Sequence, residues 1–563
     1  MTATTTTKKE KKKMAVDYGV YLVTDSTPAI LGGRSLAGVV EASLRGGVGI
    51  VQYRDKTAGH DEAVRVAREL LAVTRRFGVP LLVNDRVEVA VEVGCEGVHI
   101  GQDDMGAFVR SFVLLDSHAA AESASSADER DVHPGRLLEF QKARAMLGPD
   151  KIIGVTASSP DEALRACEAG ATYLGLGTVY ATATKKDTKS IIGPHGVRGI
   201  LAALAAAGHG AVPTVCIGGV SASNAAAVLA ASSSSSSSSP AKSLDGVAVV
   251  SALVAAPDPA EAAGHLLAQV LRARIPDVVR SVAATTPLSH NMTNLVVQNI
   301  AANVALAVGA SPIMANYAEE AADLARLGGA LVVNMGTVTP DGLKNYLQAL
   351  KAYNDAGRPV VLDPVGAGAT AVRRSAVETL LSAGQYAVIK GNSSEMLTVR
   401  GTSPSVAQRG VDSTSQLSLA QRARLARDVA RRRRCVALVT GATDVLSDGR
   451  RTVRVDNGHE LLGMITGSGC TLGTAVSAMV CAPVGAADPL AAAVAAAVMF
   501  GVASEMAAER AEVRGPGTFV PAFLDELYGI RKATAAGDLR WLVLAKVRAV
   551  DVPEDKEEDK ETS

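Results

Sequence analysis

The stretch Gly49-Ile50-Val51-Gln52-Tyr53-Arg54-Asp55-Lys56 changes within a few residues from an apolar run to a polar one. The apolar part predicts a buried β-strand over 49–52, so the polar part falls at the carboxyl end of that strand. Similar strands, separated by helical patterns such as 36–45 and 61–77, recur through the first half of the chain. We expect them at 20–23, 49–52, 81–83, 97–100, 152–155, 173–176, 214–217 and 247–250. This alternation predicts an α/β fold, a (β/α)8 TIM barrel, over 18–272.

Polar residues follow nearly every expected strand. One of these groups alone is as well explained by a tight turn, but a barrel brings all such strand ends to one face. Arg54, Lys56 and Lys185 suit phosphate oxygens, because both side-chain types are cationic and Arg offers a two-pronged contact. Asp85 and Asp104 supply the hard oxygen ligands that Mg²⁺ prefers. The backbone amides at Gly218-Gly219 and Val250-Ser251 suit a second, smaller phosphate.

The ordered motifs YLVTD, QYRDK, VND, GVHIGQDD, GVTAS, GLGTVYATATKKDT, CIGGV and VVSAL resemble thiamine phosphate synthase. That family joins hydroxymethylpyrimidine diphosphate to thiazole phosphate and releases pyrophosphate. The resemblance implies departure of pyrophosphate first, and capture of a pyrimidine cation by the thiazole nitrogen, with no general base needed there. The implied pyrimidine-diphosphate contacts are Gln52, Arg54, Lys56, Asn84, Thr156 and Lys185. The implied thiazole-phosphate contacts are Thr182, Thr184, Gly219, Val250 and Ser251, with Mg²⁺ at Asp85 and Asp104.

A second decisive stretch is Gly463-Met464-Ile465-Thr466-Gly467-Ser468-Gly469-Cys470-Thr471-Leu472. Its small residues precede an apolar helical run at 472–480. Glycines and a helix N-terminus suit the negative charge of a phosphoryl group in transit, although a tight turn with a buried cysteine fits this window alone. Strands expected at 331–334, 360–362, 387–389 and 436–439 predict a parallel sheet whose carboxyl ends form a site.

Two acidic residues lie close to those expected strand ends. Asp363 follows its strand directly, and Glu395 stands one helical turn after Asn392. Together they are suited to a hydrated Mg²⁺ that contacts ATP phosphates. An equally good interpretation is that Glu395 belongs to a solvated helix cap.

The motifs HNMTN, GASPIMA, NMGTVT, VLDPVGAGAT, IKGNSSE, VTGATD, TGSGC and GPGTFVPAFLD resemble hydroxyethylthiazole kinase, of the ribokinase-like superfamily. The resemblance covers 286–548. It implies the thiazole alcohol near Met314 and Gly467, and ATP near Lys390 and Thr440, where many bacterial members carry Arg in place of Lys390. Cys470 stands where ribokinase-like relatives usually have a catalytic Asp, and either its thiolate or the departing phosphate can take the alcohol proton. The amides of 467–469 then carry the main catalysis, with Mg²⁺.

The remaining segments are expected to be tails, insertions and a linker. We assign 1–17 as a disordered basic tail, 105–136 and 232–240 as surface insertions, 273–285 as a linker and 549–563 as an acidic tail. The longest apolar run, 490–503, is too short to span a bilayer and predicts a buried helix.

The totals exclude several classes of protein. Fifty-seven basic and 57 acidic residues give no net charge, so neither nucleic acid nor membrane is expected as a partner. Six scattered cysteines without a CxxC pair favour a reducing, cytoplasmic compartment. We therefore predict a fused enzyme that phosphorylates the thiazole alcohol and then condenses the product, working as a trimer or hexamer by resemblance. The alternatives are an enzyme with one inactive half and a metabolite sensor.

Overall fold

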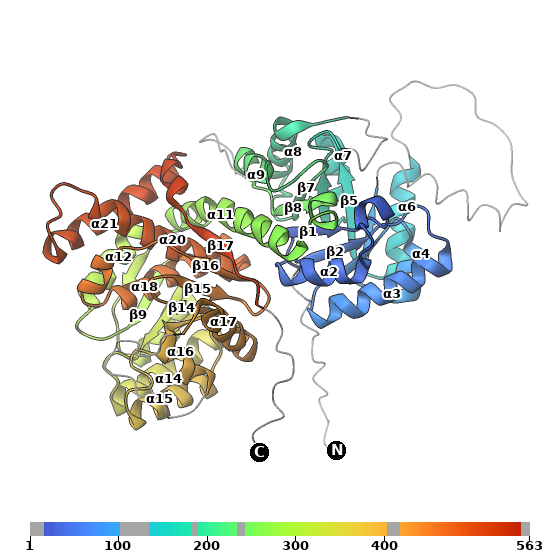
Figure 1. Ribbon diagram of the computed structural model, residues 1–563. Coiled ribbons are helices and arrows are strands. Elements are labelled where there is room, and N and C mark those ends of the chain that lie inside the picture. Colours follow the sequence, from blue (N-terminus) through green and yellow to red (C-terminus); the bar gives the residue numbers. More distant parts are fainter. Residues whose placement is uncertain (1–15, 102–133, 183–189, 233–241, 402–416, 553–563) are drawn as a thin grey trace, which may run out of the picture.

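The computed structural model describes residues 16–101, 134–182, 190–232, 242–401 and 417–552. They form two α/β units joined by one long helix (Figure 1). The predicted sites at Asp104, Thr184 and Lys185 lie outside the described residues, as do nearly all of the two predicted insertions.

The first unit is a closed barrel of eight parallel strands in sequence order, with β1 paired to β8. The strands are β1 Val20–Val23, β2 Ile50–Tyr53, β3 Leu81–Asn84, β4 Gly97–Ile100, β5 Ile152–Ala157, β6 Tyr173–Leu176, β7 Thr214–Ile217 and β8 Gly246–Val249. The helices are α1 Pro28–Leu31, α2 Leu36–Arg45, α3 His60–Arg76, α4 Val87–Val93, α6 Pro134–Leu147, α7 Pro160–Glu168, α8 Gly193–Ala206, α9 Ala225–Ser232 and α10 Ser251–Val254. All eight predicted strands and both named helices are confirmed.

The interior of the barrel is crowded by aromatic and polar side chains. Two glycines make room for them. A Cβ on Gly154 would lie 2.1 Å from the Tyr173 ring, and one on Gly175 would lie 3.2 Å from His99. Small residues on β5 and β6 therefore let two large polar side chains, His99 from β4 and Tyr173 from β6, meet inside the barrel.

The second unit is a nine-stranded sheet in the order β10-β9-β11-β12-β13-β14-β15-β16-β17. Its strands are β9 Leu288–Met292, β10 Ser311–Ile313, β11 Ala330–Asn334, β12 Val360–Asp363, β13 Val388–Asn392, β14 Val436–Thr440, β15 Asp444–Ser447, β16 Thr452–Val455 and β17 Val547–Ala549. Pairing is parallel from β10 to β14 and antiparallel beyond it. The four predicted strands are confirmed as a parallel sheet, and the five others were not predicted.

Helices cover both faces of this sheet. One face packs against α18 and α20, backed by α12 and α21, and the other packs against α13 to α17. The helices are η1 Ala318–Glu320, α12 Gln298–Val308, α13 Ala321–Leu327, α14 Pro340–Asp355, α15 Ala371–Ala383, α16 Ser393–Arg400, α17 Leu419–Arg433, η2 Glu460–Met464, α18 Ser468–Cys481, α19 Pro483–Ala487, α20 Pro489–Ala508, α21 Pro516–Ala535 and η3 Arg540–Leu544. Among the described helices, α20 alone is long and apolar enough to cross a membrane, and 89% of its most apolar window is buried in the fold.

The predicted linker at 273–285 is helical and does not separate the two units by a loop. It is the second half of α11, Pro259–Thr285, which continues through Pro276. The first half of the helix buries Leu267 and Leu271 near the barrel, and the second half buries Val278 and Val279 against the other unit. Because both halves bury apolar side chains, packing outweighs the helix-breaking tendency of the proline.

Both predicted tails include residues that belong to the folded units, namely Asp17 at one end and Ala549 at the other. Asp17 forms an ion pair with Arg451 of the second unit at 3.3 Å. At the other end, β17 pairs with β16, and Val550 donates its N–H to the carbonyl oxygen of Thr452 at 2.9 Å. Ala549 and Val550 thus belong to the edge of the sheet, and Val552 is buried, so these residues are not part of an acidic tail.

Candidate functional sites

A chain of hydrogen bonds runs through the interior of the barrel and reaches the carboxyl end of β3 at Asn84. Gln52 donates from Nε2 to Asn84 Oδ1 at 2.5 Å and accepts at Oε1 from the Tyr21 hydroxyl at 2.7 Å. The Tyr21 hydroxyl lies 2.7 Å from that of Tyr173, which lies 2.7 Å from Nδ1 of His99. Nε2 of His99 then reaches the Thr156 hydroxyl at 2.9 Å. The structure therefore joins three of the predicted pyrimidine contacts, Gln52, Asn84 and Thr156, in one network.

The network stays uncharged at its centre. Burial raises the pKa of Tyr21 and of Tyr173 far above the usual value for tyrosine, so both hydroxyls keep their protons. Three members of the network were not predicted as site residues. Tyr21 and His99 belong to the motifs YLVTD and GVHIGQDD. These motifs could have indicated them, but the prediction considered only the residues that follow each strand.

Asp85 adopts a backbone conformation that is rare for a residue with a side chain. Its φ is +60°, in the left-handed region. The carboxylate accepts from the Gly101 N–H at 2.8 Å and from Asn84 Nδ2. Strain of this kind persists where surrounding contacts enforce it, and it is concentrated at functional sites. Here it turns the carboxylate toward the ends of β3 and β4.

The other predicted barrel residues surround the same mouth. Arg54, whose backbone N–H donates to the Thr24 hydroxyl at 2.9 Å, is half-buried, and Lys56 is exposed. Gly219 has φ +64°, and a Cβ there would lie 2.7 Å from the carbonyl oxygen of Ala181, next to Thr182. Val250 precedes α10, and Ser251 opens that helix as an exposed residue. The backbone at Gly219 therefore lies close to the backbone at Ala181, in the region where the second phosphate was predicted.

The second site forms at the N-terminus of α18. Gly467 caps this helix with φ +83°, and a Cβ there would lie 2.2 Å from Val297. A Cβ on Gly469 would lie 4.0 Å from Nζ of Lys390, and one on Gly473 3.9 Å from Oδ2 of Asp363. Because the first N–H groups of a helix have no partner within it, α18 presents donors and a positive dipole end beside these charges.

Lys390 and Asp363 form a buried ion pair at 3.0 Å, with side chains 3% and 1% exposed. Burial acts to lower the pKa of Lys390, but the Asp363 carboxylate outweighs it, helped by Cys470 and Glu395, and the pKa is raised. Asn334 also donates to Asp363 at 2.8 Å. Burial raises the pKa of Asp363 despite the opposing attraction of Lys390. The pair is thus held in a buried, hydrogen-bonded contact beside the helix terminus.

Glu395 forms a helix cap, but a buried one. Its backbone N–H donates to Asn392 Oδ1 at 3.0 Å, while Oε2 accepts from the Asn392 N–H at 2.8 Å and Oε1 accepts from the Gly366 N–H at 2.8 Å. Only 5% of the residue is exposed, so the expectation of a solvated cap is wrong. Burial and the nearby Asp363 raise the pKa of Glu395 to about 7.

Cys470 lies in the first turn of α18, with Sγ 4.0 Å from Asn294 Nδ2. Burial raises the pKa of its thiol to about 11. Asn294 and Asn334, in the motifs HNMTN and NMGTVT, were not predicted as site residues. Met314 directly follows β10 and Thr440 ends β14, so both lie at strand ends of the same sheet.

Comparison with known proteins finds a different family for each half of the chain. The model of the hydroxyethylthiazole kinase family matches residues 279–533, and that of thiamine monophosphate synthase matches 20–114 and 110–253. A probable thiamine biosynthetic bifunctional enzyme of Schizosaccharomyces pombe is 37% identical over 96% of this chain and 100% of its own length. The thiamine biosynthetic bifunctional enzyme of Saccharomyces cerevisiae is 33% identical over 92% of this chain and 96% of its own. This chain belongs to the thiamine biosynthetic bifunctional enzymes.

A solved structure is also similar to the second unit. The hydroxyethylthiazole kinase of Pyrococcus horikoshii is 38% identical, covers 49% of this chain and 98% of its own, and has a TM-score of 0.42. The residues that the two family models match make the first unit the synthase half and the second unit the kinase half.

Two carboxylates of the kinase half, Asp363 and Glu395, lie near enough to each other to hold one magnesium ion. The Asp363 charge raises the pKa of Glu395, and both carboxylates act on Lys390, yet their oxygens already accept protein hydrogen bonds. Each carboxylate oxygen keeps a second lone pair, so the two fit an ion held largely through water. Among the described residues, no three His, Cys, Asp or Glu side chains are grouped to bind a metal directly.

Proposed function

We propose that this chain phosphorylates 4-methyl-5-(2-hydroxyethyl)thiazole with ATP in its second unit and condenses the product in its barrel. The second substrate of the barrel is 4-amino-2-methyl-5-(diphosphooxymethyl)pyrimidine, and the products are thiamine phosphate and pyrophosphate. One observation carries the proposal: a single chain has two strand-end sites, each with groups suited to phosphate, and family models match both halves. The catalytic units span 18–272 and 286–548, the latter with a ribokinase-like fold.

In the kinase half, the N–H groups at Gly467–Gly469 and the Lys390 cation stabilise the charge of the phosphoryl group during transfer. ATP lies near Lys390 and Thr440, and the thiazole alcohol lies near Met314 and Gly467. Magnesium, held through Asp363 and Glu395, supplies further charge neutralisation. The conformation of Gly467 and the burial of the Lys390–Asp363 pair support these roles.

In the barrel, Gln52, Asn84 and Thr156 orient the pyrimidine, and Arg54 and Lys56, with Lys185, neutralise its diphosphate. Asp85, with Asp104, would hold a magnesium ion, and the ion would supply charge neutralisation for the pyrophosphate leaving group. Thr182, Thr184, Gly219, Val250 and Ser251 hold the thiazole phosphate. The enzyme acts in the cytoplasm as a trimer or hexamer, on small molecules rather than on nucleic acid or membranes.

The test is thiamine phosphate formation from thiazole alcohol, ATP, Mg²⁺ and the pyrimidine diphosphate by purified protein. Asp85→Ala should accumulate thiazole phosphate, while Gly467→Asp should make thiamine phosphate only when thiazole phosphate is supplied. If the unaltered enzyme itself needs supplied thiazole phosphate, the second unit is a scaffold and the proposal fails.

A further inference from the structure

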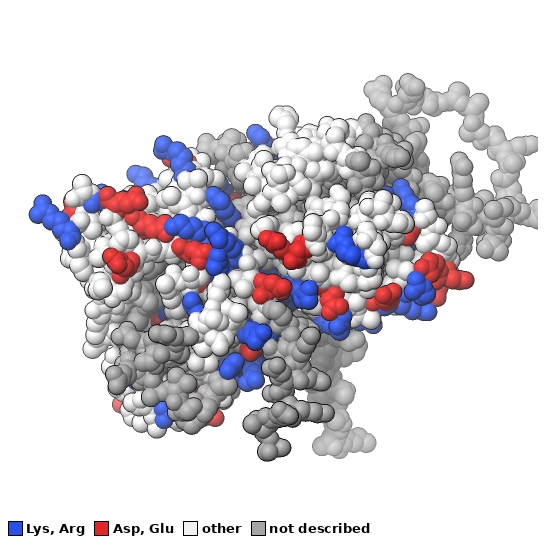
Figure 2. Space-filling view, in the orientation of Figure 1, with Lys and Arg blue, Asp and Glu red and all other residues white. Residues whose placement is uncertain are grey.

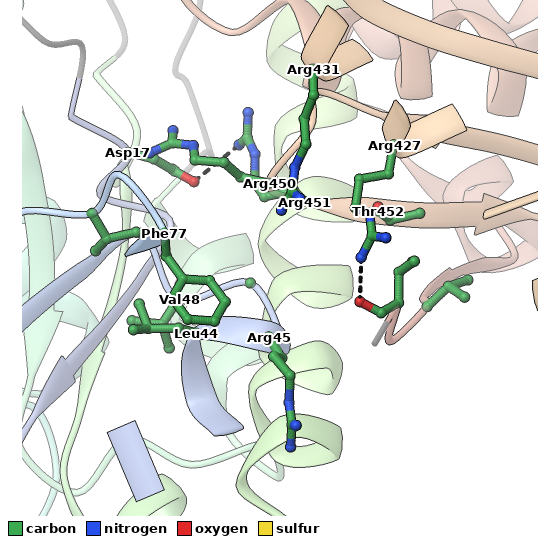
Figure 3. Close-up of a pocket in the computed structure, with 15 residues that line it drawn as sticks. Asp17, Leu44, Arg45, Val48, Phe77, Arg427, Arg431, Arg450, Arg451 and Thr452 are labelled. Atoms are coloured by element: carbon green, nitrogen blue, oxygen red, sulfur yellow. Dashed lines mark hydrogen bonds and ion pairs between the residues drawn. The ribbon is translucent and has the colours of Figure 1, made fainter. Parts of the chain in front are cut away.

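Arginine side chains have different kinds of partner in different parts of this fold. On the face shown in Figure 2, Lys and Arg side chains are interspersed with Asp and Glu. Arg451, at the cavity where the two units meet, pairs with Asp17 at 3.3 Å (Figure 3). Arg373 on α15 instead directs its guanidinium at main-chain carbonyl oxygens next to the kinase site.

Arg373 holds two loops together with three hydrogen bonds. Its Nη1 donates to the carbonyl oxygen of Met335 at 3.0 Å and to that of Val365 at 2.7 Å, and its Nη2 donates to that of Gly336 at 2.8 Å. Met335 and Gly336 directly follow β11, and Val365 lies just after β12, the neighbouring strand. The side chain therefore fixes the carboxyl ends of two adjacent strands relative to each other.

The Val365–Gly366 peptide connects Arg373 to Glu395. The carbonyl of Val365 and the N–H of Gly366 belong to one peptide unit, and in a trans peptide these two groups point to opposite sides. The Gly366 N–H donates to Glu395 Oε1 at 2.8 Å. The guanidinium of Arg373 and the carboxylate of Glu395 thus bind opposite sides of the same peptide.

The Met335–Gly336 peptide is arranged in the same way. Arg373 binds its carbonyl, while its N–H, from Gly336, donates to Asn334 Oδ1 at 2.9 Å. Asn334 in turn donates from Nδ2 to Asp363 Oδ2 at 2.8 Å. Hydrogen bonds in such chains strengthen one another because each group polarises the next. One cation is therefore connected to both carboxylates of the kinase site, in each case through a peptide.

The local sequence supports this placement of the guanidinium. Gly366 has φ +67°, in the left-handed region that glycine adopts without strain, and a Cβ there would lie 3.4 Å from Nη1 of Arg373. The N-cap of α15 is Thr370, whose hydroxyl accepts from the Arg373 N–H at 3.2 Å. The glycine and the helix cap together hold Arg373 against the Val365–Gly366 peptide.

We propose that Arg373 is a positioning residue for phosphoryl transfer in the kinase half. It acts through the two peptide units that follow β11 and β12, and so holds Glu395 and Asp363 in the orientation that the site requires. This inference rests on the proposed kinase function of the second unit. Because Arg373 acts on the carboxylates, its loss should affect the rate and the metal affinity, and not the contacts to the thiazole.

The experiment compares the unaltered chain with Arg373→Met, Arg373→Lys and Arg374→Met. Arg374 is the matched control, because it is the next residue of α15 and donates to the carbonyl of Gly368 at 2.8 Å, in the same loop but outside the two peptide units. Kinase activity is measured as ADP release with thiazole alcohol. Electron paramagnetic resonance measures the affinity for Mn²⁺ in the presence of a non-hydrolysable ATP analogue, which requires no turnover. Condensation of supplied thiazole phosphate reports on the barrel.

Arg373→Met should lower kcat and the affinity for Mn²⁺ by about 10–100-fold each, the usual effect of losing a residue that orients metal-binding side chains. The KM for thiazole alcohol and the condensation rate should change by less than about twofold, since neither depends on these carboxylates. Free guanidinium ion, at a concentration that leaves the melting temperature unchanged, should restore part of kcat. Arg373→Lys keeps the charge without the fork of donors, so it should still lose about tenfold, and it provides the same test if the methionine variant does not fold.

A loss in Arg374→Met as large as that in Arg373→Met overturns the proposal, because general disruption of the loop would then be the cause. The proposal also fails if the affinity for Mn²⁺ is unchanged, or if only the KM for ATP rises, which would place the guanidinium on the nucleotide. Absence of kinase activity in the unaltered chain would overturn the proposed function itself, and this inference with it.

Discussion

Replacing Cys470 by serine tests which group accepts the alcohol proton in the kinase half. The thiol has a pKa of about 11, so at pH 7.5 only about 0.03% of it is thiolate. Serine has nearly the same size but is a still weaker acid, so it cannot serve as a base at this pH. If Cys470 acts only by position, as we expect, Cys470→Ser should keep kcat for thiazole phosphorylation within about threefold at pH 7.5.

The assay is steady-state ADP release with thiazole alcohol between pH 7 and 9, with the barrel's pyrimidine substrate omitted. Log kcat should not follow the thiolate population in either protein. Cys481→Ser is the matched control, because this thiol ends the same helix and burial raises its pKa to about 12. A tenfold rise in the unaltered enzyme per pH unit, together with a loss of 100-fold or more in Cys470→Ser, would show that the thiolate is the base and refute the reasoning.

Three further variants and one pH dependence follow from single contacts. Gly467→Ala, with φ +83° and a Cβ 2.2 Å from Val297, should lower kinase activity at least tenfold while leaving condensation of supplied thiazole phosphate intact, measured by coupled product analysis. Tyr173→Phe leaves buried partners unsatisfied at a cost of about 1–3 kcal/mol, so KM for the pyrimidine diphosphate should rise without change in the kinase rate. Arg451→Met removes the ion-pair partner of Asp17 and Asp448 and leaves Asp488 with Arg274, so it should destabilise the chain by about 3–5 kcal/mol in denaturant melts. Burial and Asp363 raise the pKa of Glu395 from 4.5 to about 7, so its protonation stabilises the fold fully below pH 4.5. This stabilisation, roughly 3 kcal/mol, is lost as the pH rises to 7. Glu395→Gln should remove this pH dependence of the free energy of unfolding.

Strand positions and the polar residues that follow them were predictable, because burial of a parallel strand on both faces leaves a continuous apolar run. The hydrogen-bond network inside the barrel was not predictable from the sequence. His99 and Tyr173 come from strand interiors, and their meeting depends on the space left by Gly154 and Gly175 on neighbouring strands. These four residues lie far apart in the sequence, so no local sequence pattern could predict that they meet.

Conformation and burial set a second limit on prediction. Asp85 was recognised as a ligand type, but its left-handed backbone depends on contacts from β4. Glu395 was recognised as a cap residue, but its burial follows from the approach of Gly366, 29 residues away. Helix α11 was misjudged because the packing that stabilises it past Pro276 comes from two separate units.

The two sites are built with opposite electrostatics, and each suits the step proposed for it. The barrel network is made of neutral groups, since Tyr21 and Tyr173 remain protonated, and condensation at a thiazole nitrogen requires no proton to be removed. The kinase site buries the Lys390–Asp363 ion pair beside a helix terminus, and phosphoryl transfer spreads negative charge over oxygens that such groups stabilise. In the barrel, the cations proposed for the diphosphate, Arg54 and Lys56, are half-buried and exposed instead, so the two units place their charge at different depths.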